Sequence, residues 1–138
     1  MYKIAIILNK RNINIGIDLS LSYSKEKAIE VIKNIRSLGV LAELYPDEYY
    51  TPLITKEKAY LIALEQYNKA KFEQPDNFGD LVASERYHPM WYIFNARDYQ
   101  KEEDGMTPGL LTIRIDKLNG ALVTWEVDRQ YRFLNDSF

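Results

Sequence analysis

Apolar and polar residues alternate with period two along residues 109–127, and an Asn-Gly pair divides this stretch into two runs. The apolar positions are Leu111, Ile113 and Ile115 in the first run, and Ala121, Val123, Trp125 and Val127 in the second. Alternating runs joined at Asn-Gly are typical of a β-hairpin. A three-residue loop at 118–120, with Gly120 left-handed in a bulge, would pair Ile115 with Val123 and bring both apolar rows onto one face. We therefore predict a hairpin over 109–127 that packs one face on the core.

Residues 1–45 show a β-β-α-β pattern of hydrophobicity. The apolar run at 3–8 predicts a mostly buried strand, and alternation at 13–19 predicts a second, half-exposed strand. Helical spacing of apolar residues follows, with Ser24 as the expected N-cap and Gly39 as the expected stop. Residues 40–45 then predict a short strand. We expect the first two strands to join a larger sheet.

The rest of the chain predicts one helix followed by a β-meander. The helix begins at Thr55 and ends before Pro75, because proline disfavours a helical predecessor. Further expected elements are a short strand at 81–86, an interior strand at 90–97 that is apolar on both faces, a charged loop at 98–108, the hairpin, and a final piece at 131–134. The pattern predicts an α+β fold, with a largely antiparallel sheet, two helices packed on one face and a C-terminal β-meander.

The chain length of 138 residues favours one domain, 1–138. A proline-bounded loop near 46–54 marks a soft boundary between the β-β-α-β half and the half with a helix and a meander. A net charge of −2 disfavours a direct nucleic-acid surface, and the absence of cysteine excludes disulfides and thiolate metal sites. No apolar stretch is long enough for a membrane span or a secretory signal, so a cytoplasmic protein with no membrane partner is expected.

The sequence holds no recognisable catalytic constellation. His88 is the only histidine, so it cannot form a two-histidine metal site, and a structural or exposed role is favoured over that of an acid or base. Phosphate-loop and nucleophile-elbow patterns are absent. Glu85, Glu126 and Asp128 could be imagined as a carboxylate pair of a glycosidase, but nothing in the sequence fixes their separation. We expect no enzyme, no cofactor and no metal.

Two loops place acidic side chains beside aromatic ones. They contribute Asp47, Glu48, Tyr49 and Tyr50 from the first loop, and Tyr99, Glu102, Glu103 and Asp104 from the second. Binding residues are concentrated on loops, and acidic groups steer a basic partner during encounter. The ordinary alternative is a pair of solvated loops, with the 11 tyrosines of the chain serving mainly an aromatic core. We name these eight residues as the candidate partner-binding set.

Three segments carry a family resemblance. They are Thr-Lys-Glu-Lys-Ala-Tyr-Leu-Ile-Ala at 55–63, Trp-Tyr-Ile-Phe at 91–94, and Pro-Gly-Leu-Leu-Thr-Ile-Arg-Ile-Asp-Lys-Leu-Asn-Gly-Ala-Leu at 108–122. This half of the chain resembles PepSY-like or cystatin-like domains, in which a helix precedes a meander. Similar small domains occur among the immunity proteins of bacterial polymorphic toxin and contact-dependent growth inhibition systems.

The resemblance implies a cytoplasmic immunity protein that binds a cognate toxin domain and occludes its active site. Many such toxins act on nucleic acids and are basic, so the partner is expected to be a basic domain, with a nuclease as one candidate. A PepSY-like peptide-binding or regulatory domain is the alternative, with a peptide lying along a sheet edge. A small enzyme of unrecognised type is the third hypothesis.

Overall fold

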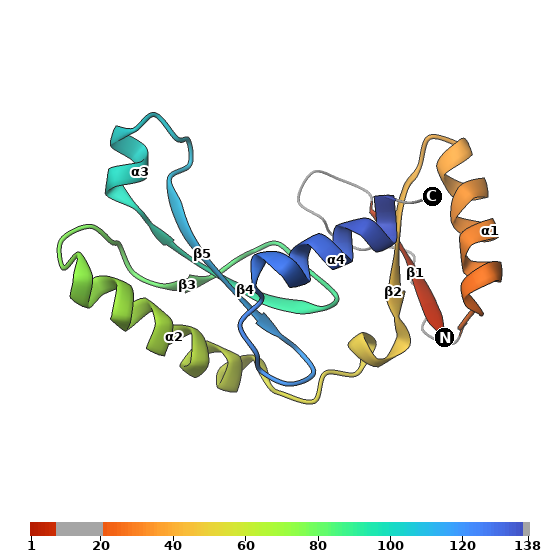
Figure 1. Cartoon of the computed structure of the whole chain (residues 1–138), viewed down its shortest axis with the longest axis horizontal. Coiled ribbons are helices and arrows are strands. Elements are labelled where there is room, and N and C mark those ends of the chain that lie inside the picture. Colours follow the sequence, from red (N-terminus) through yellow and green to blue (C-terminus); the bar gives the residue numbers. More distant parts are fainter. Residues whose placement is uncertain (8–20, 137–138) are drawn as a thin grey trace. The chain divides into compact units, whose positions relative to one another are not determined.

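The computed structural model describes residues 1–7 and 21–136, and the chain divides into two compact units (Figure 1). The first unit consists of Met1–Pro52, Arg86–Met90 and Thr124–Phe138, and the second of Leu53–Glu85 and Trp91–Val123. The chain first passes between them after Pro52, inside the proline-bounded loop. The strand predicted at 13–19 lies outside the described residues.

Each unit combines helices with antiparallel strands. The first unit contains β1 (Tyr2–Ile7), α1 (Lys25–Ser37), β2 (Leu41–Pro46), the 3-10 turn η1 (Asp47–Tyr50) and α4 (Trp125–Asp136). The second contains α2 (Lys56–Glu73), β3 (Val82–Ala83), β4 (Trp91–Arg97), α3 (Tyr99–Glu103) and β5 (Leu110–Asp116). The predicted α+β class is confirmed, and the strands form two separate sheets within the described residues.

In the first unit, β1 and β2 form an antiparallel pair that α1 covers on one face. Figure 1 shows this helix running alongside both strands. The core between them contains Ala28, Ile32, Ala42 and Leu44. Local chemistry sets the helix ends as predicted: the Ser24 hydroxyl accepts a hydrogen bond from the Lys27 N–H, and Gly39 follows the helix with a φ of 78°.

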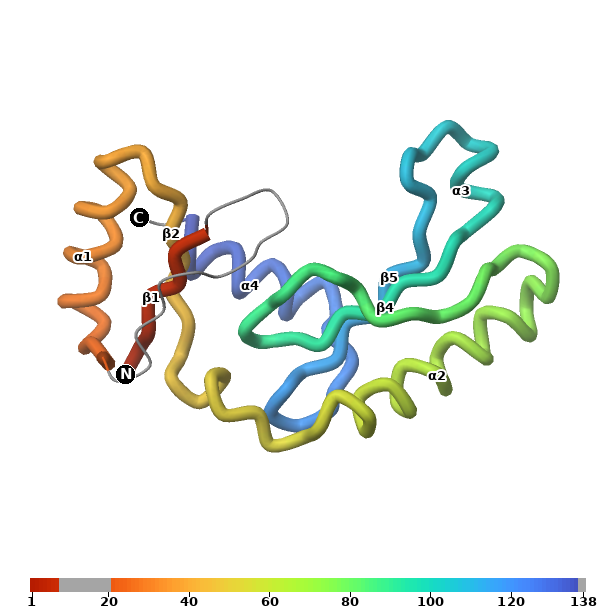
Figure 2. The backbone as a smooth tube through the Cα atoms, turned by 180° about the vertical axis from the view of Figure 1, so that it is seen from behind, coloured from red at the N-terminus to blue at the C-terminus, as the bar shows by residue number. Residues whose placement is uncertain are grey.

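In the second unit, β4 is the central strand of the order β3-β4-β5, as its two apolar faces predict. The helix α2 packs along β4 and β5 (Figure 2), burying Ala59, Ala63 and Tyr67 against Phe94 and Ile115. Thr55 is its N-cap and Glu73 its last residue, as expected. Each of the two predicted helices therefore packs on a sheet of its own.

The predicted hairpin is wrong beyond its first strand. The strand β5 ends at Asp116, and the chain then forms a four-residue loop, because the Asp116 N–H donates to the Ala121 carbonyl at 2.8 Å. Gly120 is left-handed as predicted, with a φ of 73°. Ile115 lies opposite Leu122, however, and not opposite Val123. The expected second strand is reduced to an isolated bridge.

The helix α4 replaces the rest of that strand and the piece predicted at 131–134. Two carboxylates, Glu126 and Asp128, lie in its first turn, where the helix dipole favours negative charge. The Glu126 carboxylate also accepts a hydrogen bond from the Thr124 hydroxyl, and Arg132 pairs with Asp128 four residues earlier, at 3.2 Å. These helix-start signals outweigh the period-two alternation, and Trp125 is left 68% exposed.

Candidate functional site

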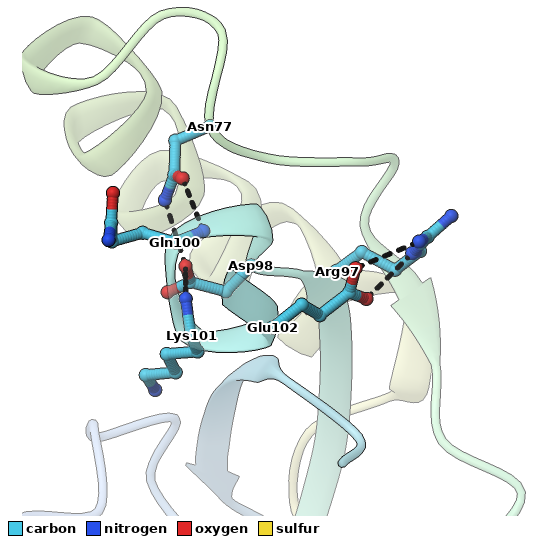
Figure 3. Close-up of polar contacts among 6 residues, drawn as sticks. All are labelled: Asn77, Arg97, Asp98, Gln100, Lys101 and Glu102. Atoms are coloured by element: carbon cyan, nitrogen blue, oxygen red, sulfur yellow. Dashed lines mark hydrogen bonds and ion pairs between the residues drawn. The ribbon is translucent and has the colours of Figure 1, made fainter. Parts of the chain in front are cut away.

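The charged loop at 98–108 contains the short helix α3, whose N-cap is Asp98 (Figure 3). The Asp98 carboxylate accepts hydrogen bonds from the Lys101 N–H at 3.1 Å and from the Asn77 amide at 2.9 Å. Asn77 in turn accepts from the Gln100 N–H at 2.8 Å. Burial opposes ionisation of Asp98, but these hydrogen bonds outweigh it and lower the pKa of the carboxyl. The first turn of α3 is thereby tied to the loop after α2.

A second set of contacts holds the outer side of α3. Arg97 donates two hydrogen bonds to Glu102, each 2.9 Å long, in the bidentate arrangement drawn in Figure 3. This pairing lowers the pKa of the Glu102 carboxyl. The Arg97 guanidinium also lies 5.1 Å from the centre of the Tyr99 ring. Gly109 packs directly on the helix, since a Cβ there would lie 2.7 Å from the Glu102 nitrogen.

These contacts leave a fixed helix with exposed acidic and apolar side chains. Glu103 and Asp104 are exposed, as are Tyr99 at 38% and Met106 at 54%. We call these four residues the α3 tip. Glu102, by contrast, is engaged by Arg97, so its charge is already compensated within the chain.

The other predicted loop forms η1, and its residues differ in environment. Asp47 belongs to an internal network: it accepts from the Ser22 hydroxyl at 2.7 Å and lies 4.0 Å from the ammonium group of buried Lys3. Glu48 is exposed, whereas Tyr49 and Tyr50 are half-buried. Tyr50 points its hydroxyl inward, where the atom is buried without a hydrogen-bond partner among residues 1–7 and 21–136.

Sequence reasoning missed a polar aromatic cluster in the first unit, made of Glu43, Tyr45, Tyr50, His88 and Tyr131. Tyr45 and Tyr131 both donate to the Glu43 carboxylate, and their hydroxyl oxygens lie 2.7 Å apart. Their rings are stacked with centres 5.6 Å apart, and His88 meets both rings edge-on. Tyr50 packs edge-on against Tyr45 at 6.2 Å. We call these residues the tyrosine cluster.

The tyrosine cluster joins β2 to α4, because Tyr131 of the helix contacts Glu43 and Tyr45 of the strand. Burial first, and then the charge of Glu43, raises the pKa of Tyr131, and burial together with Tyr131 and Glu43 raises that of Tyr45. Both phenols therefore stay neutral and serve as hydrogen-bond donors. No signal in the sequence could have joined these residues, because Glu43 and Tyr131 are 88 positions apart.

The described part of the chain offers no metal centre, since no group of three or more metal-ligating side chains is found in it. The carboxylates considered for glycosidase chemistry fall in different units, with Glu85 in the second and both Glu126 and Asp128 in the first. Within residues 1–7 and 21–136, no helix combines the length and apolar character needed to cross a membrane. In comparisons with known proteins, no family model, curated protein or solved structure matches this chain.

Proposed function

We propose that this chain is a bacterial immunity protein, which binds a cognate toxin domain in the cytoplasm and neutralises it through a protein–protein interface. The α3 tip is the contact surface that we assign to the toxin. The observation that carries the proposal is the exposure of acidic and apolar side chains on a helix whose backbone is already held by Asp98, Asn77 and Gly109.

The physical argument rests on preorganisation and charge. A loop that is fixed before binding loses little conformational entropy when it meets a partner. Tyrosine and methionine are enriched in protein interfaces, and Tyr99 and Met106 supply this apolar contact area. Glu103 and Asp104 would accelerate encounter with a basic partner and disfavour acidic ones. Such a tip suits a partner whose surface is basic.

Occlusion follows from the chemistry of the partner class that the family resemblance implies. A toxin that acts on nucleic acid needs cationic side chains to bind phosphates. An acidic tip that pairs with those cations competes directly with the substrate. The proposed mechanism is therefore steric and electrostatic blocking of the substrate groove, and it requires no chemistry from the immunity protein.

The test measures binding of the purified chain to the protein encoded by the adjacent gene, by isothermal titration calorimetry, together with suppression of that protein's toxicity. Charge reversal by Glu103→Lys and Asp104→Lys in one variant is expected to weaken binding by about tenfold or more. The matched control reverses Glu65 and Glu73, which are exposed on α2 and change the net charge equally. It should bind like the parent.

Asp47 and Glu102 are left unchanged in this design. Reversing either one would place a lysine beside Lys3 or Arg97 and confuse folding with binding. If the tip variant binds as tightly as the parent, the α3 tip is the wrong surface. If the parent neither binds the neighbouring protein nor suppresses its toxicity, the immunity function itself is refuted.

A further inference from the structure

An open, mostly apolar groove lies between the beginning of α2 and the strand β3 in the second unit. Its volume is about 640 Å³, and its lining residues are Lys56, Glu57, Tyr60, Leu61, Leu81, Val82, Ala83 and Phe94. Leu81 and Phe94 are buried. Leu61 and Val82 also line the groove and are exposed, at 65% and 57%. Two large apolar side chains thus face solvent across a concave surface.

The groove is bordered by a bare sheet edge. Val82 pairs with Asn95 of β4, and the Ser84 N–H donates to the Ile93 carbonyl at 2.8 Å. In an antiparallel ladder the bonded residues alternate, so the N–H and C=O of Ala83, which lies between Val82 and Ser84, point away from β4. Within the part of the chain that the structure describes, no strand pairs with this outer edge. Its backbone groups are available to an added strand.

Carboxylates flank the edge at both ends. Asp80 precedes β3 and Glu85 follows it; both are exposed, and neither forms an ion pair within residues 1–7 and 21–136. A strand laid along β3 would therefore meet negative charge near each of its ends.

We propose that the groove and the outer edge of β3 form a docking site for an extended segment of a basic partner polypeptide. The segment carries apolar residues at alternate positions and a basic residue at each end. Its backbone pairs with Ala83, its apolar side chains enter the groove between Leu61 and Val82, and its cationic ends approach Asp80 and Glu85. The choice of a basic partner rests on the proposed function, whereas the site itself does not.

The probe is an acetylated and amidated hexapeptide, Lys-Val-Thr-Val-Thr-Lys, titrated into the full-length chain labelled with nitrogen-15. Amide shifts are expected at Leu61 and at residues 81–84. The acid-ended peptide Glu-Val-Thr-Val-Thr-Glu is expected to bind about tenfold more weakly, because two attractive end contacts become repulsive. N-methylation of the central valine, which removes a donor to the edge, should weaken binding further.

Matched variants distinguish the local effect of the two carboxylates beside β3 from the effect of the chain's net charge. Asp80→Asn combined with Glu85→Gln should abolish the difference between the two peptides, whereas Glu73→Gln combined with Asp76→Asn should preserve it. The proposal is overturned if the basic-ended peptide at millimolar concentration leaves residues 81–84 unshifted, or if both peptides bind the parent equally. No toxin is present in this experiment, so its outcome is distinguishable from failure of the immunity assay.

Discussion

The outer edge of β2 in the first unit and the outer edge of β3 in the second differ in whether other parts of the chain bind their backbone groups. On β2 in the first unit, the Asn135 side chain accepts from the Leu44 N–H at 2.6 Å and donates to the Leu44 carbonyl at 3.2 Å. Arg36 donates twice to the Ala42 carbonyl, at 3.0 and 2.8 Å. On β3 in the second unit, Val82 and Ala83 are exposed and no described strand continues the sheet.

This comparison distinguishes an edge that belongs to the fold from one that is open to a partner. A carboxamide offers one donor and one acceptor, so Asn135 replaces a neighbouring strand at a single residue pair. Proteins usually cover or shorten exposed edges to prevent unwanted pairing. The first unit covers the edge of β2 with α4, whereas no described strand covers the outer edge of β3, which has exposed carboxylates before and after it.

The largest effect is expected from Asn135→Leu. The substitution leaves the N–H and C=O of fully buried Leu44 without their partners, and an unsatisfied buried polar group is costly. We expect a loss of about 3 kcal/mol in the free energy of unfolding, measured by urea denaturation. The exposed α4 substitution Gln130→Ala is the control and should change stability little. A loss below about 1 kcal/mol would show that the β2 edge does not need its side-chain cover.

A pH dependence should separate the second unit from the first. Burial lowers the pKa of Lys117 to about 8, so the folded chain releases a proton that the unfolded chain retains up to pH ~10.5. The unfolded state binds more protons in this window, and stability must therefore rise with pH. We expect a gain of about 2 kcal/mol between pH ~7.5 and ~9.5 in the parent relative to Lys117→Met. If the free energy of unfolding depends on pH equally in the parent and in Lys117→Met, this prediction is wrong.

The tyrosine cluster should give the first unit the opposite response. The pKa values of Tyr45 and Tyr131 are raised by burial, so the stability they contribute is complete below pH ~10 and is lost as the pH rises further. Tyr131→Phe removes one hydroxyl from Glu43 and should cost about 1 kcal/mol at neutral pH. It should also make the alkaline loss shallower than in the parent, as measured by urea denaturation above pH ~10. If the variant loses stability as steeply as the parent in alkaline solution, Tyr131 is not a source of that loss.

Local chemistry explains what the sequence could predict. Ser24 and Thr55 each cap a helix through the hydroxyl, and both signals lie within four residues of the bonds they form. Gly39 was recognisable because it ends a helical run of apolar residues, and Gly120 because it follows Asn119 in a turn signal. Both take a positive φ. The central place of β4 followed from apolar residues on both faces. None of these predictions required knowledge of distant contacts.

The failures come from ambiguity and from distance. Val123, Trp125 and Val127 fit a strand, while Val127, Tyr131 and Leu134 fit a helix, and Thr124 with two following carboxylates decides for the helix. The closure of the β2 edge by Asn135 joins residues 91 positions apart, and no local pattern encodes it. In the candidate site, the pairing of Glu102 with Arg97 could not be predicted either. It depends on how α3 folds back onto the end of β4.

The smallest effect is expected at the bare edge itself, from Val82→Lys. This side chain is 57% exposed, and its backbone bonds to β4 are unaffected by the substitution, so the free energy of unfolding should change by less than about 0.5 kcal/mol. Urea denaturation of the variant beside Asn135→Leu makes the contrast direct. The same lysine should weaken binding of the basic-ended hexapeptide, because it adds a like charge to the groove. If Val82→Lys instead destabilised the chain by more than about 1 kcal/mol, the β3 edge would be part of the fold's own packing. The difference between the two edges would then lose its functional meaning.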